Sequence, residues 1–352
     1  MDRLTKIICT LGPSTSTEAS VAGLIGAGMD YARLNFSYGS HDEHKDRMDM
    51  LRRVSAGKRK VGIIQDLPGP KIRIGSMEGK IKLKEGSTVV LAEDGASGKG
   101  EIPVTCKGLA RAVSSGGSIL MSDGKIRLKV KGTENGSVSC VVEDGGTIKA
   151  HNGVSIVGGK LDIGAITEED MEHMKFGIEN GVDYIAISFV TSADDIRLAK
   201  SLIAKWGSDI PVIAKVERKA ALDNLDGIIE ASDAVMVARG DLAIDIGFEN
   251  LALAQKRIIK RSNELGKPVI AATQFLFSMV RGKVPTRAEA TDIANAVIDG
   301  SDAIMLSDET AVGRYPQRAV AVLDMIVSRM EEEQDIRRRL SERRNRFYDR
   351  FH

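Results

Sequence analysis

The sequence has little cysteine and few aromatic residues. Cys9, Cys106 and Cys140 are odd in number and form no CxxC pair, which argues against a disulfide framework and a cysteine zinc knot. Aromatic residues make up 4% of the chain, which leaves little for stacking on nucleic-acid bases. We therefore expect a reducing compartment, the cytoplasm, and no nucleic-acid partner.

Long apolar runs and an excess of one charge are also missing. No apolar stretch approaches the roughly 18 residues that a membrane span needs, and the N-terminus, MDRLTKIICTLGPS, lacks the apolar core of a secretion signal. Fifty Lys and Arg against 49 Asp and Glu leave a net charge of +1, so no global field attracts nucleic acid or a membrane. Hydrophobic residues at 42% are typical of a globular chain rather than a disordered one.

What the sequence does contain is eight short apolar runs with helical patterns between them. Each run is nearly continuously apolar, as are strands that are buried on both faces. Amphipathic helices follow most of them, most clearly over 250–265 and 287–299. Eight such units predict an α/β fold, a TIM (β/α)8 barrel, with an open doubly wound sheet as the alternative. The runs are Lys6–Thr10, Asp30–Leu34, Val61–Asp66, Tyr184–Phe189, Val212–Val216, Ala234–Ala238, Val269–Thr273 and Ala303–Leu306.

The pattern changes between the third and fourth runs. From about Gly69 to Ser155 apolar and polar residues alternate, as in Lys80–Leu83 and Ile126–Val130, and turn pairs such as Asn135-Gly136 separate the segments. This predicts a small all-β barrel inserted after the C-terminal end of a strand, where it is placed to act as a lid over an active site. The predicted organisation is barrel 1–68, β lid 69–155, barrel 156–332 and an Arg-rich, solvated tail 333–352.

Charged side chains stand at or just after the ends of the fifth and sixth runs. Lys215 and Glu217 project to the same side of a strand, and such groups are costly to bury in a barrel mouth unless they bind something. Asp241 stands where a helix begins, after Gly240, which lets the backbone approach a ligand. Glu217 and Asp241 offer hard oxygen ligands suited to Mg²⁺ or Mn²⁺, with a structural ion pair as the alternative.

Cationic, acidic and hydroxyl side chains also stand at or just after the ends of the second, third and seventh runs. Arg33 offers a fixed fork for a phosphate group. The phosphate-loop signature GxxxxGK[ST] is absent. Taken together, the residues at successive strand ends predict a metal-assisted phosphate site. The other members of this set are Asn35, Ser37, Asp66, Lys71, Arg73 and Thr273.

Several segments resemble the pyruvate kinase family. They occur in the family's order between about residues 4 and 330. The resemblance implies a catalytic barrel interrupted by a small β-domain, and a phosphotransferase that moves the phosphoryl group of phosphoenolpyruvate to ADP, giving pyruvate and ATP in glycolysis. The segments are Lys6–Pro13, Ala32–Gly39, Gly69–Arg73, Ile213–Glu217, Met236–Leu242, Gly266–Gln274, Pro285–Gly300 and Asp302–Pro316.

The resemblance implies roles for the substrate-binding residues. Lys215 matches the family's catalytic lysine, which neutralises charge on the moving phosphoryl group and on the enolate oxygen. Arg33 matches the arginine that binds the substrate phosphate. Thr273 matches the threonine that lies near the substrate carboxylate and near the path by which the enolate receives its proton. The amides of Gly240 and Asp241 would receive the carboxylate.

The resemblance also implies cations and a nucleotide site. Glu217 and Asp241 match the ligands of the divalent cation, Mg²⁺ or Mn²⁺, and Arg33, Arg73 and Asn35 match groups near the nucleotide.

A monovalent cation is common in this family as well. In much of the family K⁺ lies at the positions of Asn35, Ser37, Asp66 and the carbonyl of the next residue, here Leu67. A glutamate is usual where this chain has Lys71. We expect the Lys71 ammonium to supply the charge, so that K⁺ is not required.

The family usually continues into a C-terminal domain that carries effector binding and one tetramer interface. We expect a short form without this regulatory domain, not activated by sugar phosphates, and a homo-oligomer, a dimer or tetramer, formed through barrel faces. Two alternatives stay open: a Mg-enolate lyase or aldolase on a related barrel, and a non-catalytic binding protein of pyruvate-kinase type. A lyase would need no nucleotide, so the residues that match the nucleotide site would have no role in it. A protein that had lost its catalytic activity would have no physical reason to keep charged side chains buried.

Three histidines are interpreted as structural. His41 and His44 begin a polar helix with no third metal ligand nearby, so a solvated helix face is predicted. His173 has no evident partner in the sequence.

Overall fold

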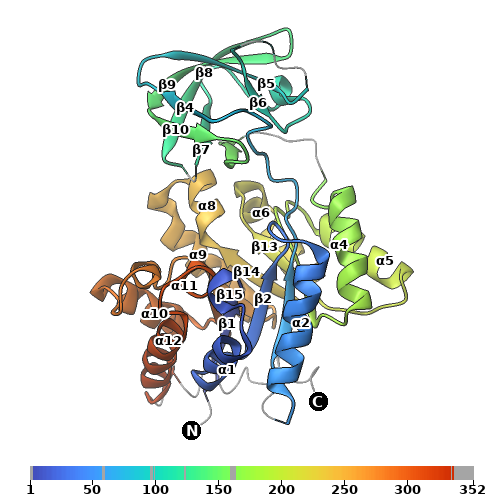
Figure 1. Ribbon diagram of the computed structural model, residues 1–352, viewed down its shortest axis with the longest axis vertical. Helices are drawn as coiled ribbons and strands as arrows, with labels where there is room; N and C mark the ends of the chain where they lie inside the picture. Colours follow the sequence, from blue (N-terminus) through green and yellow to red (C-terminus); the bar gives the residue numbers. More distant parts are fainter. Residues whose placement is uncertain are drawn as a thin grey trace. The chain divides into compact units, whose positions relative to one another are not determined.

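Eight parallel strands form a closed barrel (Figure 1). Their order around the barrel is β1-β16-β15-β14-β13-β12-β3-β2. The computed structural model describes residues 3–57, 60–95, 98, 100–122, 124–158, 164–333 and 335–336. The predicted (β/α)8 barrel is confirmed, and the open-sheet alternative is wrong. The strands are β1 (Lys6–Thr10), β2 (Tyr31–Asn35), β3 (Gly62–Asp66), β12 (Tyr184–Ile187), β13 (Val212–Val216), β14 (Ala234–Ala238), β15 (Val269–Ala272) and β16 (Ala303–Leu306).

Two compact units divide the chain. The first consists of Met1–Gly69, Ala165–Arg239 and Ala252–His352 and contains the barrel; the second consists of Pro70–Gly164 and Gly240–Leu251. Of the Arg-rich tail predicted over 333–352, only 333 and 335–336 are described. No helix in the described ranges is long and apolar enough to span a membrane.

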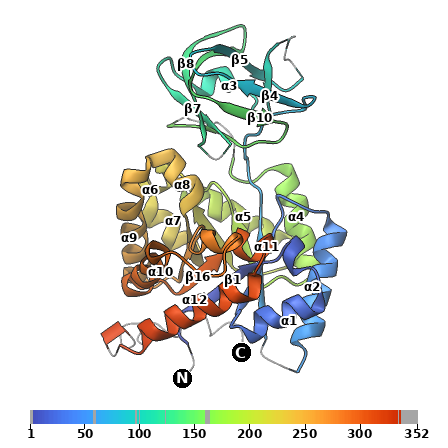
Figure 2. The ribbon, with the colours of Figure 1, turned by 60° about the vertical axis from the view of Figure 1, so that its left-hand side comes forward.

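Helices surround the barrel strands, and their ends follow capping rules. The Thr286 side chain accepts a hydrogen bond from the Glu289 amide at 3.2 Å, while the Glu289 carboxylate accepts one from the Thr286 amide at 2.7 Å, a capping box. The last helix, α12, packs against α1 and α10 (Figure 2). The helices of the barrel unit are α1 (Glu18–Gly26), α2 (His41–Ser55), α4 (Glu168–Glu179), α5 (Ala193–Lys205), α6 (Lys219–Asp223), α7 (Leu225–Ala231), α9 (Phe248–Glu264), α10 (Arg287–Asp299), α11 (Asp308–Ala311) and α12 (Pro316–Glu331), with short 3-10 turns η1 (Pro13–Thr15) and η2 (Phe277–Val280).

Alternate strand residues fill the inside of the barrel. Tyr31 and Tyr184 meet edge to face with ring centroids 6.2 Å apart, a favourable aromatic arrangement. Gly62 makes room for this pair, because a Cβ there would lie 2.5 Å from the Tyr31 ring. The interior cluster comprises Ile8, Tyr31, Ile64, Tyr184, Ala186, Ile213, Ala234, Met236, Ile270, Ala272, Ala303 and Met305.

Four aspartates tie alternate strand pairs together at the N-terminal end of the barrel. Each precedes a strand and accepts a hydrogen bond of 2.7–2.9 Å from a backbone amide at the start of the neighbouring strand. Its own amide donates to the carbonyl of that same residue at 2.9 Å. These paired bonds set the register at the barrel end opposite to the strand ends that carry the predicted site. The pairs are Asp30 with Ile7, Asp183 with Ile63, Asp233 with Val212 and Asp302 with Val269.

The chain leaves and re-enters the barrel unit at one buried carboxylate. Asp170 accepts hydrogen bonds from the Gly69 amide at 3.0 Å, from the Thr167 amide at 2.8 Å and from the Thr167 hydroxyl at 2.7 Å. Its side chain is fully buried. Both ends of the intervening segment are therefore anchored to the start of α4.

The second unit is mostly β-structure. Its strands form a six-stranded sheet, β11-β7-β8-β9-β5-β6, and a two-stranded sheet, β10-β4. Asn135 and Gly136 connect β8 and β9 with φ of 49° and 85°, as the predicted two-residue hairpin requires. The unit also holds most of α8 (Arg239–Ile246) and one short helix, α3 (Leu109–Ala112). Its strands are β4 (Lys80–Leu83), β5 (Thr88–Glu93), β6 (Ile102–Val104), β7 (Ser118–Met121), β8 (Ile126–Glu134), β9 (Ser137–Asp144), β10 (Gly146–Lys149) and β11 (Val154–Ile156).

The histidines correct one expectation from the sequence. His44 is buried, with its ring stacked on Phe36 at 3.9 Å between centroids, and His41 Nε2 lies 2.7 Å from His173 Nδ1. Burial lowers the pKa of His44 to about 4, with help from the charge of Arg47. The solvated face predicted for His41 and His44 is wrong, because the first turn of α2 packs against α4.

We predict that Asp302→Ala lowers the free energy of unfolding by about 1–3 kcal/mol, because the Val269 amide loses its acceptor inside the structure. Asp302→Asn keeps an acceptor oxygen and should lose less. Urea unfolding of both variants measures the effect. Equal stability of Asp302→Ala and the unaltered protein would show that the aspartate does not tie the strands.

Candidate active site

A buried lysine joins the C-terminal ends of three neighbouring strands. Lys215, on β13, is 8% exposed. Its Nζ lies 2.9 Å from Asp66 Oδ1 and 3.0 Å from Glu217 Oε1, and it donates to Ser188 Oγ at 2.6 Å. Asp66 ends β3 and Ser188 follows β12, which pairs with both β3 and β13. The ammonium is therefore surrounded by three oxygen-bearing side chains at the barrel end where active sites of this fold form.

An arginine extends the cluster to the first two strands. Arg33 Nε donates to Asp66 Oδ2 at 2.6 Å, and its Nη1 donates to Thr10 Oγ1 at 3.1 Å. The Thr10 hydroxyl in turn donates to the Leu306 carbonyl at 2.9 Å. Each oxygen of the Asp66 carboxylate thus faces one cation, Lys215 or Arg33.

The charges of this cluster stabilise one another. Burial by itself would raise the pKa of Asp66, but Arg33 and Lys215 outweigh it and the pKa is lowered. Burial likewise would lower the pKa of Lys215, yet Asp66 and Glu217 raise it above its ordinary value. Lys215 is therefore an ammonium, and Asp66 a carboxylate, throughout the neutral range.

The second carboxylate is oriented by a strained backbone. Glu217 is 2% exposed, and its Oε2 accepts a hydrogen bond from the Phe189 amide at 2.7 Å. Phe189 has φ of 56°, a left-handed conformation that is uncommon for an aromatic residue. In this conformation the Phe189 amide points at Glu217. Strained backbone conformations of this kind cluster at functional sites.

The residues expected around a monovalent cation are engaged within the barrel unit. Asn35 Oδ1 accepts a hydrogen bond from the Ser37 amide at 3.1 Å, and the Leu67 carbonyl accepts one from Ser188 Oγ at 2.7 Å. Asp66 holds the two cations described above. Ser188 therefore links the Leu67 carbonyl to Lys215.

Four of the predicted site residues, Lys71, Arg73, Gly240 and Asp241, belong to the second unit. Lys71 Nζ lies 3.1 Å from Asp241 Oδ1, and Arg73 Nη1 donates to the His151 carbonyl at 3.3 Å. Gly240 and Asp241 are the second and third residues of α8. The grouping of these residues with Lys215 stays a prediction.

Thr273 follows β15 at the same end of the barrel. Its carbonyl accepts a hydrogen bond from Arg239 Nε at 3.2 Å. Thr273 and Gln274 both have positive φ, so the chain makes a tight turn there.

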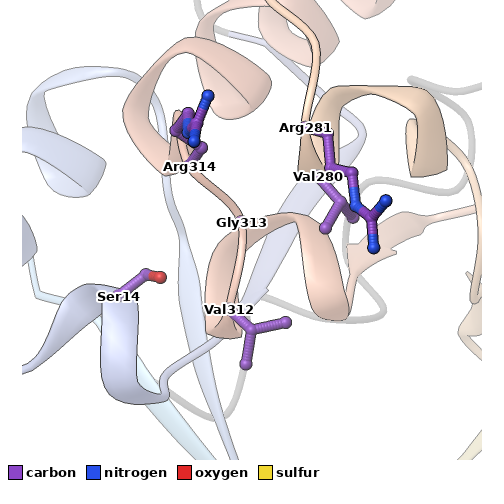
Figure 3. A pocket seen from close by; sticks show the side chains of 6 residues that line it. All are labelled: Ser14, Val280, Arg281, Val312, Gly313 and Arg314. Carbon is purple, nitrogen blue, oxygen red and sulfur yellow. The ribbon is translucent and has the colours of Figure 1, made fainter.

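A pocket of about 730 Å³ lies beyond the ends of β1, β15 and β16. It contains none of the predicted catalytic residues. Arg281 and Arg314 line it, but their side chains extend in different directions (Figure 3), so they do not converge on one anion. The pocket residues are Ser14, Val280, Arg281, Val312, Gly313 and Arg314.

The donor chemistry of the site fits a hard divalent cation that takes few protein ligands. Glu217 presents a buried carboxylate at the strand ends, and carboxylate oxygen is what Mg²⁺ and Mn²⁺ prefer. Within the described ranges, no group of three or more His, Cys, Asp or Glu side chains is arranged to hold a metal.

Comparison with known proteins decides the family. Residues 2–320 match the family model described as pyruvate kinase, barrel domain. The chain belongs to the pyruvate kinase family. A pyruvate kinase of Mycobacterium tuberculosis is 44% identical over 335 residues, which cover 94% of this chain and 71% of the relative.

Two further relatives agree with this assignment. A pyruvate kinase of Thermococcus litoralis is 44% identical over 331 residues, 93% of this chain and 70% of the relative. One of Staphylococcus epidermidis is 42% identical over 346 residues, 97% of this chain and 59% of the relative. The chain is accordingly an enzyme of the phosphotransferase class.

Sequence reasoning missed several groups that the fold brings to these strand ends. Ser188 and Thr10 contact Lys215 and Arg33, and Arg239 and Glu309 contact the segment after β15. Ser188 and Thr10 each stand at the C-terminal end of a predicted strand, a position that would have found them. Arg239 directly follows the predicted strand 234–238, so the same positional signal would have found it, whereas Glu309 lies three residues after a predicted strand.

We predict that Asp66→Asn destabilises the barrel unit by about 3 kcal/mol or more, because the buried Lys215 and the partly buried Arg33 lose their shared counter-charge. Urea unfolding measures the loss. Asp223→Asn is the matched control: it breaks the exposed Lys219–Asp223 pair, and exposed pairs contribute little. Similar midpoints for both variants would contradict the assigned role of Asp66.

Proposed function

We propose that this chain catalyses pyruvate kinase chemistry, the transfer of a phosphoryl group from phosphoenolpyruvate to ADP to give pyruvate and ATP. The observation that carries the proposal is the Lys215 ammonium, held between Asp66 and Glu217 at the C-terminal end of a barrel of this family. A buried cation at that place is suited to negative charge that develops during phosphoryl transfer.

Lys215 acts as a fixed positive charge rather than as a base. Its raised pKa keeps the proton on Nζ at neutral pH, so it has no lone pair with which to abstract a proton. We assign it to the phosphoryl group in transit and to the enolate oxygen left behind. Because Asp66, Glu217 and Ser188 already orient the ammonium, little reorganisation is needed when the charge develops.

Arg33 and Thr273 complete the substrate side. The Arg33 fork is anchored by Asp66 and Thr10, which suits it to a phosphate group in a defined orientation. We assign Thr273 to the substrate carboxylate and to the path by which C3 of the enolate receives its proton. The Gly240 and Asp241 amides, at the start of α8, would bind the carboxylate.

We assign the divalent cation, Mg²⁺ or Mn²⁺, to Glu217 and Asp241. Glu217 directly follows β13 and Asp241 lies three residues after β14, which is paired with β13. A bound divalent cation would neutralise phosphoryl and enolate oxygens. Arg33, Arg73 and Asn35 are assigned to the nucleotide phosphates.

Further features of the family are proposed for this chain as well. We expect the cytoplasm as its location and a homo-oligomer formed through barrel faces. Phe277, Val284 and Val312 are each more than half exposed, and exposed apolar side chains are consistent with contact to a second copy.

We predict that Lys215→Met lowers kcat by about 10²–10³-fold or more, since it removes a charge that acts mainly in the transition state. The KM for phosphoenolpyruvate should change much less. A coupled assay for pyruvate, with and without ADP and Mg²⁺, measures both. Lys219→Met, which alters an exposed lysine four residues further on, is the matched control.

The same assay separates the alternatives. Pyruvate formation that needs both ADP and Mg²⁺ supports the kinase. Turnover without nucleotide would indicate lyase chemistry, and no turnover would indicate a binding protein. A Lys215→Met variant with unchanged kcat would show that another residue carries the charge.

We also propose that the Lys71 ammonium replaces K⁺. Its support is a lysine at the position where the family usually has glutamate. We predict nearly equal turnover with K⁺ or tetramethylammonium at fixed ionic strength, and a K⁺ requirement in Lys71→Glu. A large K⁺ requirement in the unaltered protein would overturn the proposal.

A further inference from the structure

The turn that follows β15 holds two consecutive residues in a strained conformation. Thr273 has φ of 74° and Gln274 has φ of 54°. Left-handed backbone at residues other than glycine costs about 1–3 kcal/mol each and persists only where the surroundings enforce it. Contacts with neighbouring residues must therefore stabilise this turn. The turn matters for function because Thr273 is one of the residues assigned to the substrate.

Arg239 holds the turn from the side of β14. It directly follows that strand, and its Nε donates to the Ala272 carbonyl at 3.0 Å and to the Thr273 carbonyl at 3.2 Å. Its Nη2 also donates to the Thr273 carbonyl. The guanidinium therefore binds the two backbone carbonyls at which β15 ends and the strained turn begins.

The guanidinium is itself held from three sides. Asp292, on α10, accepts from Nη1 at 2.7 Å, and Gln255, on α9, accepts from the same nitrogen at 3.4 Å. The Phe275 ring lies 3.7 Å from the guanidinium carbon, a stacking geometry that arginine favours. With only 8% of Arg239 exposed, the group has little freedom to move.

Glu309 holds the other end of the turn from the side of β16. Its Oε1 accepts a hydrogen bond from the Leu276 amide at 3.0 Å, and its Oε2 accepts one from the Ser307 amide at 2.7 Å. The residue is 1% exposed. The segment Thr273–Leu276 is thus gripped by a buried cation at its start and a buried anion at its end.

Burying the charges of Arg239 and Glu309 costs desolvation free energy, which a turn with a purely structural role would not require. Burial lowers the pKa of Arg239, opposed by Asp292 and Glu309, and burial raises the pKa of Glu309. An apolar contact would pack the turn without desolvating either charge. Directed hydrogen bonds, by contrast, fix the orientation of the backbone and of the side chain that it carries.

We propose that Arg239 and Glu309 are positioning residues that clamp the strained Thr273 turn, so that the Thr273 side chain is presented to the substrate when the enolate takes up its proton. The proposal rests on the proposed function and assigns neither residue a contact with substrate. Through Thr273, the clamp sets the rate of proton transfer.

A double-mutant cycle tests the clamp. We compare Arg239→Met, Thr273→Ala and the double variant by kcat for phosphoenolpyruvate, by the KM, and by exchange of the pyruvate methyl hydrogens with deuterated water in the presence of Mg²⁺ and ATP. That exchange breaks and re-forms only the C–H bond, so it reports the proton step. We expect Arg239→Met to slow the exchange by about 10²-fold, as misplacement of an aligned group does, with a much smaller change in KM.

The decisive measurement is the effect of Arg239→Met on the exchange rate in the Thr273→Ala background. If Arg239 acts through Thr273, the double variant exchanges no more slowly than Thr273→Ala alone, because coupled residues are not additive. Glu309→Gln keeps the shape but removes the charge, and it should give the same non-additive pattern. Arg239→Lys should recover little, because a lysine does not reproduce the forked geometry.

A matched control separates the clamp from general stability. Arg261→Met removes a guanidinium that pairs with Asp226 at 2.8 Å on the surface of the same unit, and it should leave the exchange unchanged. Melting temperatures of all variants are measured alongside. Should Arg239→Met fail to fold, Glu309→Gln and Asp292→Asn carry the test.

Failure of the clamp proposal and failure of the proposed function give different results. Additive effects of Arg239→Met in both backgrounds, or a lowered melting temperature with unchanged exchange, would show a structural anchor only and would overturn the clamp. An unaltered protein that makes no pyruvate from phosphoenolpyruvate and ADP would instead overturn the proposed function.

Discussion

The ion cluster around Lys215 is the constraint on which the barrel's functional end depends. A buried ammonium and a partly buried guanidinium lie there with two buried carboxylates, and burying any of these charges without its partners would be costly. Their mutual attraction keeps Lys215 protonated and Asp66 ionised. The arrangement thus holds an ammonium and a guanidinium in fixed positions where a phosphoryl-transfer reaction develops negative charge.

The two ends of the barrel have different roles, one in stability and the other in chemistry. At the N-terminal end, four aspartates pair with backbone groups of neighbouring strands and set the register. At the C-terminal end, side chains from successive strands contact one another, and Phe189, Thr273 and Gln274 adopt strained conformations. Barrels of this fold carry their active sites at the C-terminal end, and strained conformations cluster at functional sites.

Much of the barrel could be predicted because its strands are buried on both faces. Such strands read as apolar runs, and the bounds of β1, β13, β14 and β16 agree with the predicted ones. The alternation of side chains along a strand also predicted that Lys215 and Glu217 lie on the same side, and in the structure Lys215 Nζ lies 3.0 Å from Glu217 Oε1. The contact of Lys215 with Ser188, and the burial of His44, involve residues distant in sequence, which no local pattern encodes.

The sequence by itself determined the barrel, the residue types at its strand ends and the family, because periodicity and motifs are local properties of the chain. Only the tertiary structure decided which charges neutralise which. Asp66 was expected beside a monovalent cation, yet its two oxygens face Lys215 and Arg33, and Arg239 turned inward to the Thr273 carbonyl. The reason is that the partner of a buried charge is chosen by the closure of the barrel, which brings together strands that lie more than a hundred residues apart in the chain.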